Sequence, residues 1–155
     1  MGVSVARLPA SEQAWLHSVI APYFIELAPD FGPPLPGEVE RWWQDPGHSA
    51  WVIADNEEKV GFALILTHRD ATRELAEFGI VPECRNRGLG AQALACLLQT
   101  LTGRWWLGVA SALPGTARFW DRVLSDHPQV QELQRGAALT PLQSHSYTFT
   151  ARSRP

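Results

Sequence analysis

The stretch IVPECRNRGLGAQA, residues 80–93, constrains the fold of this 155-residue chain more than any other. An apolar pattern typical of a strand ends near its start, and a helical pattern begins at Leu89, with leucines recurring on one face. The chain must therefore turn from a strand into a helix within a few residues. Gly88 and Gly90 stand in that turn.

Such a turn has the features of an anion site. Backbone N–H groups in the first turn of a helix lack intrahelical partners, and the helix end carries about half a unit of positive charge. Glycines at positions 88 and 90 leave these groups uncovered, and Arg85 and Arg87 supply charge-assisted hydrogen bonds. The sequence therefore predicts a phosphate or pyrophosphate ligand, although the glycines alone also fit a tight turn that binds nothing.

Two widespread phosphate-binding patterns do not account for this turn. The Walker loop requires Lys and then Ser or Thr after its last glycine, where this chain has Ala91 and Gln92. The dinucleotide pattern G-x-G-x-x-A matches residues 88–93, but it needs an acidic residue about twenty positions later. Residues 105–112 contain none. A nucleotide-binding oxidoreductase is therefore the weakest of the interpretations.

Arg85-x-x-Gly88-x-Gly90 resembles the coenzyme A pyrophosphate loop of the GNAT family of N-acetyltransferases, whose pattern is Q/R-x-x-G-x-G/A. Residues 103–107 and 117–123 also resemble the next strand and helix of a small bacterial branch of predicted acetyltransferases. The resemblance implies that acetyl-CoA is the co-substrate and that no metal is needed. It also implies direct transfer of the acetyl group, in a ternary complex, to a primary amine of a small molecule or protein.

The resemblance assigns roles to residues of the strand and the turn. Backbone groups of Phe78, Gly79 and Ile80 would hold the pantetheine arm like an added strand. Gly79 supports this independently, because a glycine inside a strand often marks a bulge or a close backbone approach. The residues implied to hold the pyrophosphate are Arg85, Asn86, Arg87, Gly88, Leu89, Gly90 and Ala91.

Glu74 is the predicted general base. An ammonium must lose a proton before its nitrogen can attack a thioester, and Glu74 matches the catalytic glutamate of the histone-acetyltransferase branch. Strand alternation places the nearby Glu77 on the opposite face of the sheet, where a solubilising role is expected.

Three positions depart from the pattern of the family. Gly108 stands where many relatives have a glutamate, Leu113 where they often have an asparagine, and Trp120 where a tyrosine can protonate the leaving thiolate. Indole cannot donate a proton in that way. Either the thiolate leaves unaided, another group such as Tyr147 serves, or the chain is an acyl-CoA-binding module with weak or no turnover.

The order of predicted elements is a strand, two helices, three strands, a helix, a strand, a helix and two strands. This order predicts one α/β (α+β) domain over residues 1–155, with a largely antiparallel sheet flanked by helices. By resemblance, its central strand pair is splayed. Pro22 should kink or split the first helix, which Ser11 and Glu12 can cap, and Gly103 should cap the helix that begins at Leu89.

Composition excludes several classes of protein. The formal charge of −3 gives no general affinity for nucleic acid or an anionic membrane, and no apolar run reaches the length of a membrane span. The five histidines show no metal-ligand spacing. Without a secretory leader, a cytoplasmic bacterial enzyme is expected, and the sequence leaves open whether it forms a homodimer.

Overall fold

The computed structural model describes residues 2–32, 34–113 and 115–153. In these residues one seven-stranded sheet has the order β1-β2-β3-β4-β5-β7-β6, and only the β4–β5 pair is parallel. The strands are β1 (Val3–Arg7), β2 (His48–Asp55), β3 (Glu58–Thr67), β4 (Arg73–Ile80), β5 (Gly103–Ala110), β6 (Val130–Ala137) and β7 (Gln143–Ala151). The helices are α1 (Gln13–Leu27), α2 (Pro36–Gln44), α3 (Leu89–Thr100) and α4 (Thr116–Asp126). The mixed, largely antiparallel fold predicted from the sequence is confirmed.

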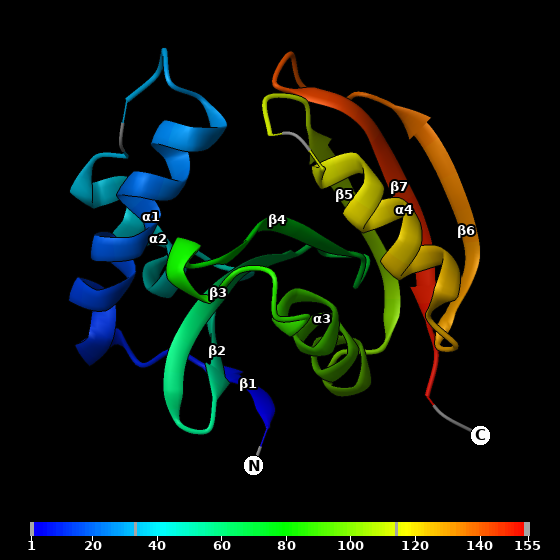
Figure 1. Cartoon of the computed structure of the whole chain (residues 1–155), viewed down its shortest axis with the longest axis horizontal. Coiled ribbons are helices and arrows are strands. Elements are labelled where there is room, and N and C mark those ends of the chain that lie inside the picture. The colour runs from blue at the N-terminus through cyan, green and yellow to red at the C-terminus, as the bar shows by residue number, and fades with distance from the viewer. Residues whose placement is uncertain (1, 33, 114, 154–155) are drawn as a thin grey trace.

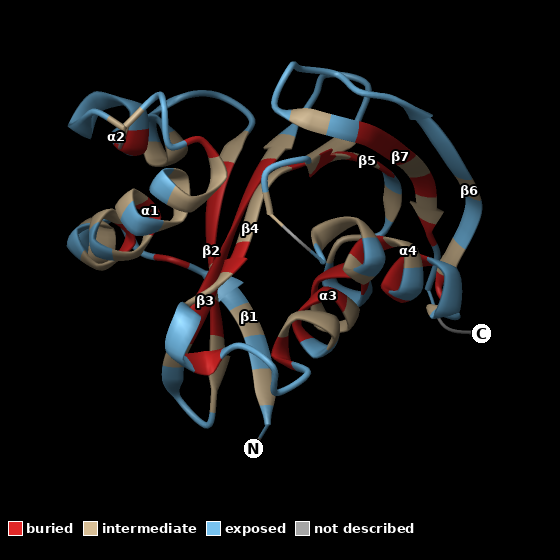
Figure 2. Cartoon of the chain, turned by 45° about the horizontal axis from the view of Figure 1, so that its top comes forward, coloured by how far each residue is buried: buried red, intermediate tan, exposed pale blue. Residues whose placement is uncertain are grey.

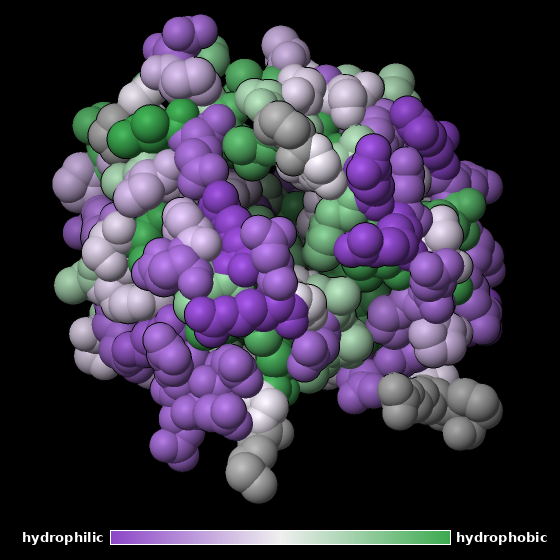
Figure 3. All heavy atoms as spheres, in the orientation of Figure 1, coloured by the Kyte–Doolittle hydropathy of each residue, from purple (hydrophilic) through white to green (hydrophobic). Residues whose placement is uncertain are grey.

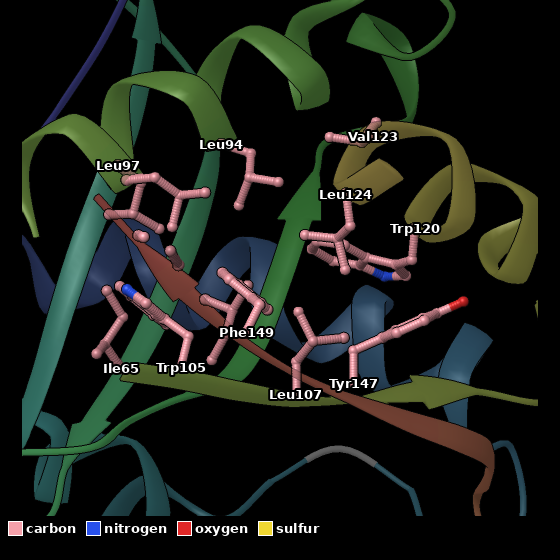
Figure 4. Packing of buried hydrophobic residues seen from close by; sticks show 14 of the residues in the cluster. Ile65, Leu94, Leu97, Trp105, Leu107, Trp120, Val123, Leu124, Tyr147 and Phe149 are labelled. Carbon is pink, nitrogen blue, oxygen red and sulfur yellow. The ribbon is translucent and has the colours of Figure 1, made fainter. Parts of the chain in front are cut away.

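Helices cover both faces of this sheet (Figure 1). α1 and α2 pack on one face of the half formed by β1 to β4, where Leu16, Ile20 and Val39 meet Phe62 and Leu64. α3 and α4 pack on the other face. Their apolar residues form one cluster with side chains of β3, β4, β5 and β7, and Figure 4 shows this packing around Trp105, Trp120 and Phe149.

Burial follows the position of each strand in the sheet. The central strand β3 and strand β7 are buried over much of their length, whereas β6 forms an exposed edge (Figure 2). β2 and β3 are joined through Asn56 and Glu57, whose φ angles of 49° and 73° are those of a tight hairpin turn. This hairpin helps to fix the register of the half of the sheet that carries β4.

Two local predictions about helix ends are wrong, and so is one of the two effects predicted for Pro22. Pro22 does not split α1, because the buried face around Leu16 and Ile20 holds the helix together across the lost hydrogen bond. Neither Ser11 nor Glu12 gives α1 a side-chain cap; a short 3₁₀ turn, Ala10–Glu12, precedes it instead. Gly103 does not cap α3 but begins β5, with a φ of 116°.

The parallel strands β4 and β5 remain together only at their beginnings. Arg73 pairs with Trp105 and Glu74 with Trp106, and beyond these two pairs the strands diverge. Because the remainder of β4 has β3 on one side alone, its other edge faces an opening between the two halves of the sheet (Figure 1). The splayed central pair predicted by resemblance is present.

Candidate active site

A cleft with a volume of about 920 Å³ lies between β4 and β5, where the two strands separate. Its walls come from α1, β4, the start of α3, β5, α4 and the first residues of β7. In the space-filling view the hollow opens near the centre of the molecule, with hydrophilic residues gathered on one side of it and apolar residues on the other (Figure 3). This volume accommodates an elongated ligand together with a smaller second one.

The predicted pantetheine strand lines this cleft. Phe78, Gly79 and Ile80 lie on the part of β4 that has no partner from β5, so one edge of their backbone is open to a ligand. A Cβ at Gly79 would lie 3.0 Å from the Tyr23 ring and 3.1 Å from the Phe62 ring. Gly79 therefore marks a close approach of neighbouring side chains to the strand.

The predicted pyrophosphate turn connects β4 to α3. Gly88 is the N-cap of α3 in the left-handed conformation, with φ 74°, and no side chain caps the helix. The N–H groups of its first turn are thus available to an anion. Asn86 also has a positive φ, 65°. At Gly90 a side chain would also crowd the protein itself, because a Cβ there would lie 3.2 Å from the Phe119 ring of α4.

The two arginines of the turn are not both aimed at the anion site. The guanidinium of Arg85 donates to both carboxylate oxygens of Glu26, at 2.9 and 3.0 Å, and its Nε donates to the Ile80 carbonyl. Arg87 is exposed and donates to the Glu83 carbonyl at 3.3 Å. In this structure the backbone of the turn, rather than these side chains, provides the donors for an anion.

Two further arginines, which no motif in the sequence indicates, line the cleft from α4. Arg118 and Arg122 are exposed and lie one helical turn apart, on the wall opposite α1. The only signal in the sequence is their i, i+4 spacing on a helix, which is common on any solvated helix face.

A β-bulge changes the orientation of the acidic residues on β4. Leu64 pairs with Glu77 and Ile65 with Leu75, so Ala76 is an extra residue without a partner. Residues opposite each other in a ladder share a face. Glu74 pairs with Leu66 and Glu77 with Leu64, so both carboxylates lie on the face covered by α1. The prediction that Glu77 points to the opposite face from Glu74 is therefore wrong.

Glu74, the predicted base, lies where β4 and β5 begin to separate. Its side chain is 24% exposed, and its Oε1 lies 3.4 Å from Nε2 of His68, whose ring stacks on Trp106. Burial raises the pKa of Glu74, and the neighbouring His68 partly opposes this. Glu74 lines the cleft, as a base must.

Glu77 lies three residues further along β4 and is more strongly desolvated than Glu74. Oε1 of Glu77 accepts a hydrogen bond of 3.2 Å from the Tyr23 hydroxyl of α1. Burial is the main cause that raises the pKa of Glu77 to about 8; the Tyr23 hydrogen bond opposes the rise, and the charge of Glu74 adds a smaller part of it. Burial, and then the nearby Glu77, also raises the pKa of Tyr23. Periodicity does not reveal this residue, because the bulge breaks the regular alternation of side chains along β4.

The β5 and α4 wall holds the three departures from the family pattern. The side-chain amide of Gln143 occupies the space beside Gly108, and its Oε1 accepts a hydrogen bond from the Leu139 N–H. Trp120 is 7% exposed and packs edge-on against Phe78, and Leu113 lines the cleft. Tyr147 is 4% exposed and belongs to the apolar cluster, so it is a core residue rather than a residue lining the cleft (Figure 4).

The fold that carries this free strand edge and uncapped helix N-terminus is similar to that of solved acetyltransferases. An acetyltransferase from Thermus thermophilus matches with a TM-score of 0.72 and 21% identity, over 97% of each chain. An aminoglycoside acetyltransferase solved with coenzyme A matches with a TM-score of 0.73 and 14% identity, over 97% of this chain and 95% of its own. Spermidine N-acetyltransferase from Vibrio cholerae, solved with coenzyme A and spermine, matches with a TM-score of 0.65 and 13% identity, over 96% of this chain and 94% of its own.

The chain belongs to the acetyltransferase (GNAT) family, whose model matches residues 14–124. It is therefore an acyltransferase with acetyl-CoA as co-substrate, and the free β4 edge and the open turn at Gly88 fit that molecule. A search of curated proteins finds no match. Among the described residues, no group of three or more His, Cys, Asp and Glu side chains is placed to hold a metal ion. No helix in the described ranges has the length and apolar character needed to cross a membrane.

Proposed function

We propose that this protein is an N-acetyltransferase that moves the acetyl group of acetyl-CoA directly to a primary amine of a small molecule or protein. The observation that carries the proposal is the cleft itself, because an unpaired strand edge and an uncapped helix end lie along one wall and two carboxylates lie on the same strand. Residues 1–155 would act as one catalytic domain, which the structural matches over nearly the whole chain support.

Each part of the wall has a task in this proposal. The open edge of β4 from Phe78 to Ile80 would hold the pantetheine arm and donate an N–H to the thioester oxygen, where negative charge develops. The turn from Asn86 to Ala91 would hold the pyrophosphate. A carboxylate of β4, for which the sequence predicts Glu74, would remove the proton of the ammonium. Holding amine and thioester together supplies much of the rate.

An acidic acceptor site supports a cationic amine as the substrate. Glu74 and Glu77 both line the cleft on the side of α1, and α1 contributes Tyr23, Phe24 and Leu27 to the same lining. Two carboxylates beside apolar side chains favour an amine carried on an apolar group, since the ammonium is attracted and the remainder is desolvated.

Thermal unfolding with acetyl-CoA, CoA, NAD and ATP, followed by an assay of thiol release, tests the proposal. Acetyl-CoA and CoA should raise the melting temperature, because a ligand that binds only the folded state stabilises it, and NAD should not. Thiol release with at least one member of an amine library should follow. Stabilisation by acetyl-CoA with no release for any amine would instead support the alternative, a module that binds acyl-CoA without efficient turnover.

A further inference from the structure

We propose that Glu77, positioned by the Tyr23 hydroxyl, takes the proton from the acceptor ammonium, and that Glu74 attracts the ammonium without taking its proton. This inference rests on the proposed acetyl transfer. The sequence predicts Glu74 as the base. We assign that role to Glu77 instead, which the bulge at Ala76 places on the same side of the cleft.

The position of Glu77 suits a proton acceptor better than that of Glu74. Glu77 directly precedes Phe78, the first residue of the edge proposed to hold the thioester arm, whereas Glu74 lies at the last pair that still joins β4 to β5. The Tyr23 hydroxyl donates to Oε1 of Glu77 and so fixes the carboxylate. Among the described residues, no hydrogen bond engages the other oxygen of Glu77, which leaves it for an incoming amine or water.

Glu74 is less free to act as the base. Its carboxylate lies 3.4 Å from Nε2 of His68, so a protonated His68 would compete with the ammonium for it. Its side chain is also 24% exposed to solvent, and a charge so exposed serves to attract a cation rather than to receive its proton.

The charged groups around Glu77 come from several elements. Tyr23 and Glu26 lie on α1, and Glu26 is neutralised by its pair with Arg85. Glu74 lies on β4, and Arg118 and Arg122 line the far wall on α4. Burial in this setting raises the pKa of Glu77 to about 8, which brings the carboxylate closer to the basicity of an amine and makes proton transfer easier near neutral pH.

The step balances in atoms and charge. The ammonium gives one proton to Glu77, and the freed nitrogen lone pair forms the C–N bond to the acetyl carbon. The C–S bond breaks, and its electron pair leaves with the sulfur of coenzyme A. The second nitrogen proton neutralises that thiolate, and Glu77 returns its proton to water in the cleft. No protein acid is required at Trp120.

The test is the pH dependence of kcat/KM, measured by thiol release with one active amine for the wild type and four variants. Glu77→Gln should lose about 100-fold or more of the activity. In the wild type, kcat/KM should rise with pH as Glu77 loses its proton. Tyr23→Phe removes a hydrogen bond that lowers the pKa of Glu77, so this rise should move to higher pH. Glu74→Gln removes a charge that raises this pKa, so the rise should move to lower pH. Glu40→Gln, an exposed glutamate of α2, is the control and should change nothing.

The possible outcomes separate this inference from the function on which it rests. Retained stabilisation of Glu77→Gln by CoA, together with lost turnover, would support it, since folding and cofactor binding are then intact. An active wild type whose Glu77→Gln variant keeps its rate and pH profile would overturn the role of Glu77 alone. The same conclusion would follow if only Glu74→Gln lost activity. A wild type that releases no thiol with any amine would overturn the acetyl transfer, and this inference with it.

Discussion

The two walls of the cleft are built differently. On the β4 wall, Gly79 lies close to the rings of Tyr23 and Phe62, and the Tyr23 hydroxyl is bonded to Glu77. On the β5 wall, the space beside Gly108 holds the flexible end of the Gln143 side chain. Both walls therefore have a strand glycine that makes room for a neighbour, but the neighbour is rigid on one side and movable on the other.

This difference indicates which wall holds the general base in place and which can adapt to the part of the acceptor that extends away from the ammonium. A general base must be held in a fixed position, and packed aromatic rings behind β4 provide that rigidity. A polar side chain that can swing, such as Gln143, suits a wall that adapts to different acceptors. The same substitution should therefore change stability and activity differently on the two walls.

The largest expected effect comes from removing the half-buried carboxylate of Glu77 on the β4 wall. An acid whose pKa rises from 4.5 unfolded to about 8 folded gives stability that is complete below pH 4.5 and lost as the pH approaches 8. Glu77→Gln removes this dependence. The variant should unfold with a free energy larger by on the order of 3 kcal/mol at pH 9, and by much less at pH 5. Urea denaturation at both pH values measures the difference, and equal stability of the two proteins at pH 9 would contradict the burial of Glu77.

A methyl group on the rigid wall should have the next largest effect. Gly79→Ala forces the Tyr23 and Phe62 rings to move, because its Cβ would lie 3.0 to 3.1 Å from them. We expect a loss of about 1–2 kcal/mol in unfolding free energy and a lower kcat, since Tyr23 would no longer hold Glu77 as well. Thermal unfolding and thiol-release kinetics check this. If Gly79→Ala left the free energy of unfolding unchanged, α1 and its Tyr23 ring would be able to shift more easily than their packing indicates.

The same change on the β5 wall should cost less stability. Gly108→Ala would place its Cβ about 2.1 Å from the end of the Gln143 side chain, but that end can rotate away when it gives up its hydrogen bond from the Leu139 N–H. The free energy of unfolding should fall by about 0.5–1 kcal/mol. The KM for the acceptor should change instead, because Gln143 lines the cleft. A stability loss equal to that of Gly79→Ala would remove the contrast between the walls.

Much of the fold, and the open turn at Gly88, could be predicted from the sequence because both follow from local chemistry. Leucine spacing indicates α3, and a glycine such as Gly88 meets the need for a left-handed residue at the start of a helix. The resemblance supplied the family and the splayed strand pair. In these regions the local preference and the tertiary structure agree.

The acidic residues of the site could not be predicted in the same way. Alternation counts residues, and the extra residue Ala76 shifts that count between Glu74 and Glu77 without any glycine or proline to signal it. The pairing of Arg85 with Glu26 joins positions 59 residues apart, which no local pattern shows. Long-range geometry therefore decides which charged side chains face the cleft.

The smallest expected effect is on the affinity for coenzyme A, when single arginines of the two walls are replaced. Arg85 is bonded to Glu26 on the α1 side, whereas Arg118 and Arg122 on α4 line the cleft without an ion pair among the described residues. Arg118→Gln or Arg122→Gln should weaken CoA binding by about threefold at low salt, because an exposed charge contact contributes little and is screened. Arg85→Gln should weaken it less. Titration calorimetry at two salt concentrations measures these constants. A larger loss for Arg85→Gln would mean that its guanidinium leaves Glu26 for the phosphates when coenzyme A binds, as the sequence pattern predicts.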